Sequence, residues 1–226
     1  MVRAPTGRPD MEDSLDGANT QPPGRSTART HFAPAERRGR EELERQARDM
    51  AGSPIMQALL AASGGLLAVI NEQRQIVTLN STLLEALGID DAGEALGLRP
   101  GEALGCVHAD DNLPGGCGTG RWCSSCGAAI AIVASLAEDR TVERICTMQT
   151  TRAGVKQDLF LSVRAHPLRL DGARWVLLYL QDVSAQQELA LLQRVFFHDV
   201  LNLVTALVGH SQVLEEDVPP GLREQA

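Results

Sequence analysis

The chain has 226 residues, a formal net charge of -8 and a hydrophobic fraction of 43%. This hydrophobic content is enough for a globular core, whereas the acidic balance disfavours nucleic acid as a partner, because affinity for phosphates comes largely from basic residues. No uncharged apolar run reaches the roughly 18 to 20 residues that a bilayer span needs. We therefore expect a cytoplasmic protein with no membrane segment, in which clustered thiols bind metal or act in redox chemistry rather than form disulfides.

The first 48 residues are predicted to be a disordered N-terminal tail. Pro, Gly, Arg, Thr and Asp are frequent in residues 1–40, and no apolar periodicity persists there. A weak helix is expected to begin in the charged run 41–50 and to continue, after Ser53-Pro54, over 55–60, where apolar residues recur at helical spacing.

Two short β-prone runs follow and predict a hairpin. They cover residues 65–70 and 75–80, and the segment between them, 71–74, has turn-prone residues. A short helix is expected at 83–87 and a buried apolar helix at 128–136, on either side of a cysteine-containing loop.

Three further β-prone segments complete the predicted fold. They cover 142–150, 156–167 and 173–183, and the residues between them are typical of tight turns. Two strands, several short helices and three strands predict an α+β fold, with a five-stranded antiparallel sheet and helices on one face. Residues 185–216 then predict one long helix whose apolar residues, at spacings near three and four, suit packing against a partner helix.

Four cysteines occur in the glycine-rich loop 105–127 with the spacing C-x10-C-x5-C-x2-C: Cys106, Cys117, Cys123 and Cys126. Two intervening residues allow the last two sulfurs to bind one ion. Because neighbouring thiolates repel one another, the cluster favours metal binding or an oxidised pair. Closed sites of four thiolates hold either tetrahedral zinc or an iron-sulfur cluster, and this spacing is typical of neither the usual zinc ribbon nor the usual ferredoxin.

Two further residues, His108 and Cys146, could bind metal by their chemistry but are not expected to be ligands. His108 is interpreted as a neighbour of the site or a surface residue rather than a ligand. Cys146, in a predicted strand, is interpreted as a small buried residue apart from the loop rather than a fifth ligand.

The order of strands and helices from residue 53 to 184 resembles a PAS domain. Gln181-Asp182-Val183-Ser184 resembles the signature that often ends such domains, with Asp182 tying strand to helix and Ser184 capping the helix. We assign residues 49–184 to a PAS-like sensor domain. PAS domains commonly bind a sensory cofactor in the middle helical region, and some cytoplasmic PAS sensor kinases carry an oxygen-labile iron-sulfur cluster on four cysteines.

That resemblance implies an iron-sulfur cluster on the four loop cysteines, with the four-iron type favoured. Structural zinc is the first alternative, and a metal-free thiol switch or inert cysteines the second.

The segment Phe196-Phe197-His198-Asp199-Val200-Leu201-Asn202 is similar to the H-box of sensor histidine kinases. The resemblance implies that His198 accepts the phosphoryl group of ATP, that Asp199 manages its proton, and that Asn202 orients water in dephosphorylation of the partner. A neutral imidazole has a free nucleophilic nitrogen at pH 7. Leu203-Val204 replace the usual Pro-Leu, as in the subgroup with an unbroken His-Asp-x-x-Asn helix.

Residues 185–226 are therefore predicted to be a signalling helix with the H-box and a truncated dimerisation and phosphotransfer hairpin, broken near 218–221. No nucleotide-binding motif of the kinase family occurs in the sequence. The expected partners are a second copy through the C-terminal helix, a response regulator, and an ATP-binding kinase domain that this chain lacks. The chain resembles a protein-histidine kinase but is not expected to phosphorylate itself unaided.

The resulting hypothesis is a cytoplasmic redox or gas-sensing module of a two-component histidine kinase, in which the state of the cluster controls phosphotransfer at His198. The first alternative is a zinc-stabilised PAS module for interaction or dimerisation, without redox sensing. The second is an oxidoreductase with paired cysteines, disfavoured because Cys123-x2-Cys126 is expected in a loop rather than at a helix start and no nucleotide-binding fingerprint accompanies it.

Overall fold

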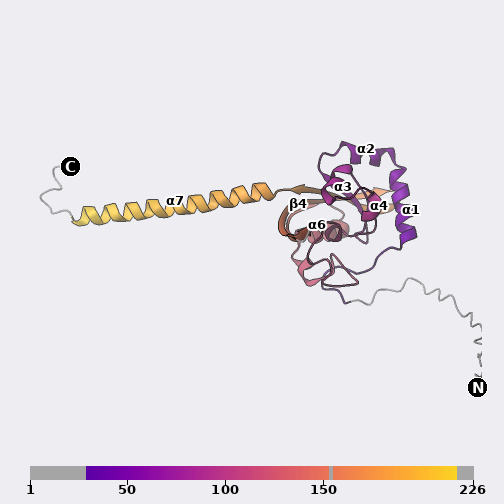
Figure 1. Ribbon diagram of the computed structural model, residues 1–226, viewed down its shortest axis with the longest axis horizontal. Helices are drawn as coiled ribbons and strands as arrows, with labels where there is room; N and C mark the ends of the chain where they lie inside the picture. The colour runs from indigo at the N-terminus through magenta and orange to yellow at the C-terminus, as the bar shows by residue number, and fades with distance from the viewer. Residues whose placement is uncertain (1–28, 153–154, 218–226) are drawn as a thin grey trace, which may run out of the picture.

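A computed structural model describes residues 29–152 and 155–217, and its centre is one antiparallel sheet (Figure 1). The strand order is β2-β1-β5-β4-β3. The strands are β1 (Leu66–Asn71), β2 (Ile76–Leu79), β3 (Val142–Arg152), β4 (Val155–Leu170) and β5 (Ala173–Asp182). The predicted α+β fold with a five-stranded antiparallel sheet of PAS-like order is confirmed.

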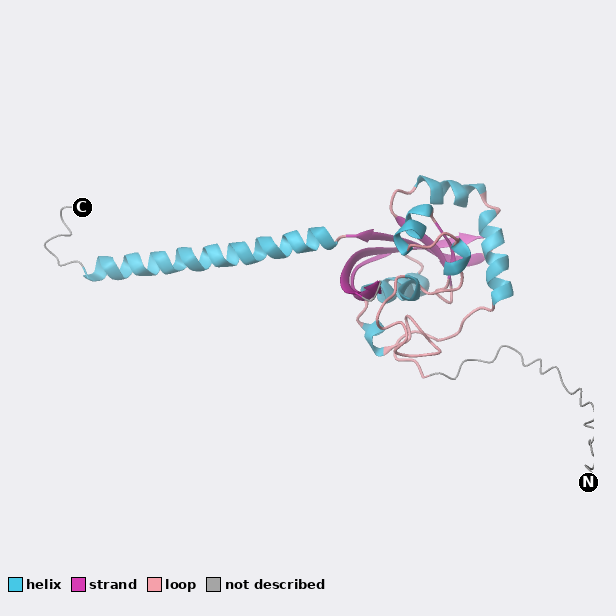
Figure 2. Ribbon diagram, viewed as in Figure 1, coloured by secondary structure: helices cyan, strands magenta, loops and turns pink. Residues whose placement is uncertain are grey.

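Short helices surround the sheet, and one long helix leaves it (Figure 2). The helices are α1 (Arg40–Ala51), α2 (Pro54–Ala62), α3 (Ser81–Leu87), α4 (Ala92–Ala95), α5 (Pro100–Ala103), the 3-10 helix η1 (Arg121–Ser124), α6 (Gly127–Glu138) and α7 (Ser184–Asp217). The predicted helices at 83–87 and 128–136 correspond to α3 and α6.

The main core lies between α6 and one face of the sheet. Alternate strand residues such as Ala68 and Ile70 join Ile132 of α6 in this core. Val69, which lies between them in β1, instead packs with Met50 and Met56 in a smaller second core. Since neighbouring strand residues point to opposite faces, α1 and α2 cover part of the face away from α6, where the sequence predicted helices on one face only.

The N-terminal segment differs from the predicted disordered tail over residues 29–48. The backbone N–H of His31 donates to the carbonyl of Thr119 at 2.8 Å, and that of Ala33 donates to the carbonyl of Gly118 at 3.0 Å. Helix α1 buries Leu43 and Met50. The segment is therefore held by backbone pairing with the cysteine loop, which apolar periodicity does not reveal. Residues 1–28 of the predicted tail lie outside the described residues.

At the junction of β5 and α7, Asp182 and Ser184 both make the contacts expected there, but their predicted roles are exchanged. Asp182 Oδ1 accepts a hydrogen bond from the Ser184 N–H at 2.9 Å, so the aspartate satisfies the first free amide of the helix. Ser184 is the first residue of α7, and its Oγ accepts from the Phe160 N–H of β4 at 3.1 Å. Asp182 thus serves as the cap, and Ser184 ties the helix to the sheet.

Helix α7 projects away from the rest of the described chain (Figure 1). Its apolar side chains are exposed, including Leu189, Leu192, Val195, Phe196, Phe197, Val200, Leu203 and Leu207. By length and composition alone, Ser184–Gln212 is the single described helix with the properties of a membrane span. The predicted break at residues 218–221 lies outside the described residues.

The first residue of α6 permits a close approach of helix and sheet, which generates a prediction. A Cβ at Gly127 would overlap the carbonyl oxygen of Ile145 in β3. Gly127→Ala should therefore lower the free energy of unfolding by about 1–3 kcal/mol, the usual cost of overpacking, as measured by urea denaturation. Gly209→Ala is the matched control, because nothing lies within 4 Å of a Cβ there. Equal stability of the two variants would contradict the packing.

Candidate functional site

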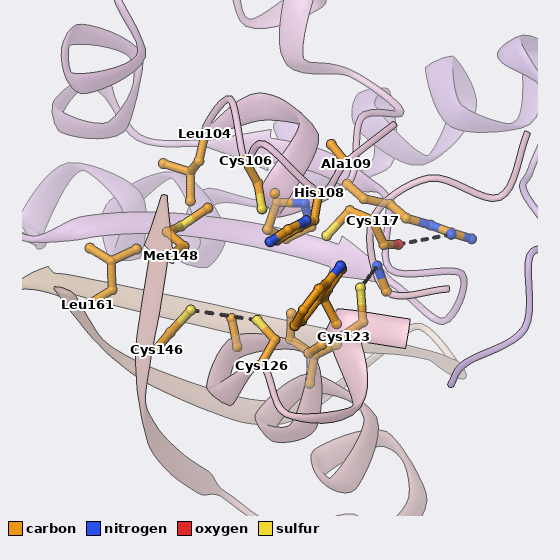
Figure 3. Close-up of a pocket in the computed structure, with 18 of the residues that line it drawn as sticks. Leu104, Cys106, His108, Ala109, Cys117, Cys123, Cys126, Cys146, Met148 and Leu161 are labelled. Carbon is orange, nitrogen blue, oxygen red and sulfur yellow. Dashed lines mark hydrogen bonds between the residues drawn. The ribbon is translucent and has the colours of Figure 1, made fainter. Parts of the chain in front are cut away.

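All five cysteines of the chain line one cavity of about 190 Å³ between α6 and the sheet. They come from five places in the sequence: Cys106 after α5, Cys117 in the following loop, Cys123 in η1, Cys126 directly before α6, and Cys146 in β3. Figure 3 shows their sulfurs around the cavity. The structure therefore gathers the four predicted site cysteines and adds a fifth.

Hydrogen bonds to β3 and α5 position the first two cysteines. Cys106 forms an isolated antiparallel bridge with Thr150 of β3, and its N–H donates to the carbonyl of Gly101 at 2.8 Å. The N–H of Cys117 donates to Glu102 Oε1 at 3.0 Å. A Cβ at Gly101 would lie 2.6 Å from the Cys117 sulfur, so a glycine is needed where these two cysteines meet α5.

The other loop cysteines are fixed by the turn that leads into α6. The N–H of Gly118 lies 3.2 Å from the Sγ of Cys123 and donates to it (Figure 3). Cys126 is the N-cap residue of α6. The sequence placed Cys123-x2-Cys126 in a loop rather than at a helix start, and this was wrong for Cys126; the preceding element is η1 and not a strand.

Cys146 lies beside Cys126, although it is 20 residues away in sequence. The two sulfurs are 3.6 Å apart. The prediction that Cys146 is buried in a strand is confirmed. The prediction that it lies apart from the loop is true of the sequence but wrong in space. The close approach depends on how α6 packs on β3, which local sequence patterns do not show.

The thiols have unequal acidities because their surroundings differ. A hydrogen bond from Cys146 is the main cause that lowers the pKa of Cys126 to about 6, with help from backbone N–H groups at the start of α6. The same hydrogen bond, followed by burial, raises the pKa of Cys146. Burial raises the pKa of Cys117 to about 12 and also raises that of Cys106.

The donor set suits soft metals, since thiolates prefer zinc and iron-sulfur groups. Within residues 29–152 and 155–217, no three His, Cys, Asp or Glu side chains form a group able to hold one metal ion. His108 also lines the cavity, but its Nδ1 lies 2.7 Å from Asp111 Oδ2 and its ring stacks on Trp122. This agrees with its expected place beside the site.

The sequence analysis did not predict two buried arginines, Arg74 and Arg99, that line the cavity. Arg99 is fully buried, and its guanidinium donates to several backbone carbonyls, among them Gly115 at 2.6 Å and Glu36 at 2.9 Å. Arg74 is 6% exposed and also lines the cavity. Burial is the main cause that lowers the pKa of Arg99 to about 9, and the nearby charge of Arg74 adds to it.

The predicted histidine site lies on α7, away from the cavity. His198 has a side chain 72% exposed, and its Nδ1 is 3.2 Å from Asp199 Oδ1. The amide nitrogen of Asn202, one helical turn later, is 3.2 Å from the same Nδ1. Helical spacing therefore brings these three residues together, and no cysteine joins them.

The acidity of Cys126 provides a test of the Cys126–Cys146 contact in reduced, metal-free protein. Alkylation of Cys126 by iodoacetamide, followed by peptide mass spectrometry, should rise with pH through a midpoint near 6, because the thiolate is the nucleophile. Cys146→Ala should move this midpoint upward, since it removes the donor that stabilises the thiolate. Cys146→Ser keeps a donor and should move it less. An unchanged midpoint in Cys146→Ala would refute the contact.

Comparisons with known proteins found likeness only among solved structures. No family model matches the chain, and no curated protein does. The PAS domain of an HTR-like protein from Haloarcula marismortui matches at 18% identity over 57% of this chain and 94% of its own, with a TM-score of 0.37. The PAS domain of nitrogen regulation protein NR(II) from Vibrio parahaemolyticus matches at 11% identity over 57% and 99%, with a TM-score of 0.41. A LOV protein from Rhodobacter sphaeroides matches at 13% identity over 65% and 69%, with a TM-score of 0.39. At such identities the likeness is one of fold alone.

Proposed function

We propose that this chain is the sensory and phosphotransfer part of a cytoplasmic two-component histidine kinase. An iron-sulfur cluster on Cys106, Cys117, Cys123 and Cys126 would report redox state or a gas, and its state would control phosphotransfer at His198. The observation that carries the proposal is that all five cysteines of the chain line one cavity. A hydrophobic core needs no such concentration of thiols.

The distribution of sulfurs favours a polynuclear centre over a single ion. Around one tetrahedral zinc with Zn–S distances of about 2.3 Å, all ligand sulfurs approach within about 3.8 Å of one another. A cluster has its own volume, so its thiolates surround a cavity and stay apart. All five cysteines line the cavity between α6 and the sheet, and no three of them form a single-ion group among the described residues, which supports a polynuclear centre. Apolar residues such as Leu104 and Leu161 line the rest of the cavity. A bound cluster supplies one-electron chemistry.

The zinc alternative is supported by the contact between Cys126 and Cys146. Their sulfurs are 3.6 Å apart, close to the separation of two ligands on one zinc. A zinc site that includes this pair would make the chain a metal-stabilised interaction module without redox sensing. Metal analysis separates the two candidates directly.

A continuous set of backbone contacts connects the cavity to α7. The N–H of Val107, next to Cys106, donates to the carbonyl of Gln149 in β3 at 3.0 Å. Strand β3 pairs along its length with β4, and Phe160 of β4 contacts both Val183 and Ser184 at the start of α7. A change in the loop would thus reach the helix through two strands, and a two-state helix pair needs only a few kcal/mol of bias to switch.

The geometry around His198 is consistent with a phospho-acceptor. Asp199 lies at Nδ1, so accepting the Nδ1–H would fix the tautomer whose lone pair is on Nε2, which lies 3.4 Å from the amide nitrogen of Asn202. That lone pair would attack the phosphoryl group while Asp199 holds the proton. The high exposure of His198 leaves this nitrogen accessible to a separate ATP-binding domain and a response regulator.

The exposed apolar residues of α7 support dimerisation through this helix. A long helix gains most of its stability in water by packing an apolar face, and α7 leaves most of its apolar side chains uncovered. A second copy of the chain would cover them. His198 and Asp199 lie in the middle of the helix, where hydrocarbon would make them costly, so packing in water is favoured over a membrane span.

Metal content tests the sensory part of the proposal. Protein purified without oxygen should contain iron and acid-labile sulfide and show broad visible absorption. Cys123→Ser should lose most of the iron, because it removes a ligand, whereas Cys146→Ser should retain it. A colourless protein with stoichiometric zinc would contradict the cluster and support the alternative.

Phosphorylation of the isolated chain tests the histidine site. Phosphoramidate, a small-molecule phosphodonor, should modify His198 and give an acid-labile adduct detectable by mass spectrometry at neutral pH. His198→Gln should abolish the adduct, and His210→Gln, on the same helix, should leave it unchanged. A phosphorylated residue other than His198 would overturn the assignment.

A further inference from the structure

We propose that Arg74 is a positioning residue for an anionic thiolate-bound metal centre in the cysteine cavity, donating its Nε–H to that centre and compensating its charge. The inference rests on the proposed function and adds a residue that the cysteine pattern does not reveal. Three features support it: the backbone conformation of Arg74, an unsatisfied donor on its side chain, and buried positive charge at the cavity.

The backbone of Arg74 is unusual for an arginine. The residue ends the turn between β1 and β2 with a φ of 65°, in the left-handed region that disfavours side chains. Its N–H donates to the carbonyl of Asn71 at 2.8 Å, which closes the turn. Glycine or asparagine would form the same turn at lower cost. The arginine therefore serves a purpose other than the turn.

The side chain of Arg74 has an unused donor inside the protein. Its Nη2 donates to the carbonyl of Pro34 in the N-terminal segment. Its Nε is buried and has no hydrogen-bond partner among the described residues. A Cβ at Gly118 would lie 3.1 Å from this Nε, which places the guanidinium against the loop between Cys117 and Cys123. Buried donors without partners are rare in proteins, and this one belongs to a residue that lines the cavity, where an acceptor would satisfy it.

The charges around the cavity are also unbalanced. No described carboxylate forms an ion pair with Arg74 or Arg99. Glu102, the nearby acid, pairs with Arg37. Two buried guanidiniums thus line the cavity with no described carboxylate in ion-pair contact, although the more distant charges of Glu36 and Glu102 act on Arg74 and Arg99 respectively. Buried charge is costly unless paired. Four thiolates on zinc or on an iron-sulfur core carry net negative charge, which would pair with both arginines.

The location of Arg74 gives it a definite effect on such a centre. A cation and an N–H donor beside thiolate sulfurs favour the more negative state of the centre. For an iron-sulfur cluster, Arg74 would make reduction of the cluster easier and its release from the protein slower. For zinc, it would only slow release of the ion. Arg99 contributes charge, but its donors are already used by backbone carbonyls. Arg74 is therefore the residue with a free donor.

The test compares Arg74→Gln, Arg74→Lys and wild type, all prepared without oxygen. The measurements are iron, sulfide and zinc per chain, the rate of metal loss to a chelator, and the midpoint of an anaerobic optical redox titration. Arg74→Gln should lose metal several-fold faster and have a lower midpoint potential. Arg74→Lys keeps the charge and should restore much of the potential. Arg121→Gln is the control, because Arg121 is exposed and stacks on Trp122.

Circular dichroism separates a folding defect from loss of the contact, and Arg74→Lys gives a second variant if Arg74→Gln fails to fold. If the wild type contains a metal centre and both Arg74 variants keep the same metal retention and midpoint potential, this inference is overturned and the proposed function stays intact. Zinc in place of a cluster would overturn the redox part of the proposed function, while faster zinc loss in Arg74→Gln would still support Arg74. A wild type that binds neither iron nor zinc would overturn both.

Discussion

The cavity depends on the close approach of α6 to β3. Gly127 has no side chain, so the start of α6 reaches the backbone of Ile145 in the strand. This contact brings Cys126, the residue before Gly127, to 3.6 Å from the sulfur of Cys146. It also directs the free N–H groups of the helix start toward the thiol of Cys126, which favours the thiolate. A side chain at Gly127 would separate the helix from the strand and open the site.

The same strand that borders the cavity connects it to the long helix. Strand β3 carries Cys146 on the cavity side and pairs with β4, and β4 holds the first turn of α7 through Phe160. This arrangement places the cysteines and His198 at opposite ends of one hydrogen-bonded path, with no side chain shared between them.

The sequence predicted the elements better than the contacts between them. Runs of β-prone residues located all five strands, a continuous apolar run located α6, and helical spacing located α7, because these patterns are local. The spacing of the four loop cysteines identified them as candidate ligands, and this role stays a prediction. Cys146, Arg74 and the N-terminal segment were missed, since each joins the site through tertiary packing or backbone hydrogen bonds. Positive φ at Arg74 has no sequence signature when the residue is not glycine or asparagine.

The missed arginines also bear on what the cavity could bind. Thiols alone would form an apolar pocket, in which two unpaired guanidiniums would be unfavourable. Buried guanidiniums are usually neutralised by carboxylates, but the nearby Glu102 already pairs with Arg37. Thiolates bound to a metal, as proposed, would supply negative charge beside the two guanidiniums and an acceptor for the free N–H of Arg74. One anionic centre would then account for the cysteines and the arginines together.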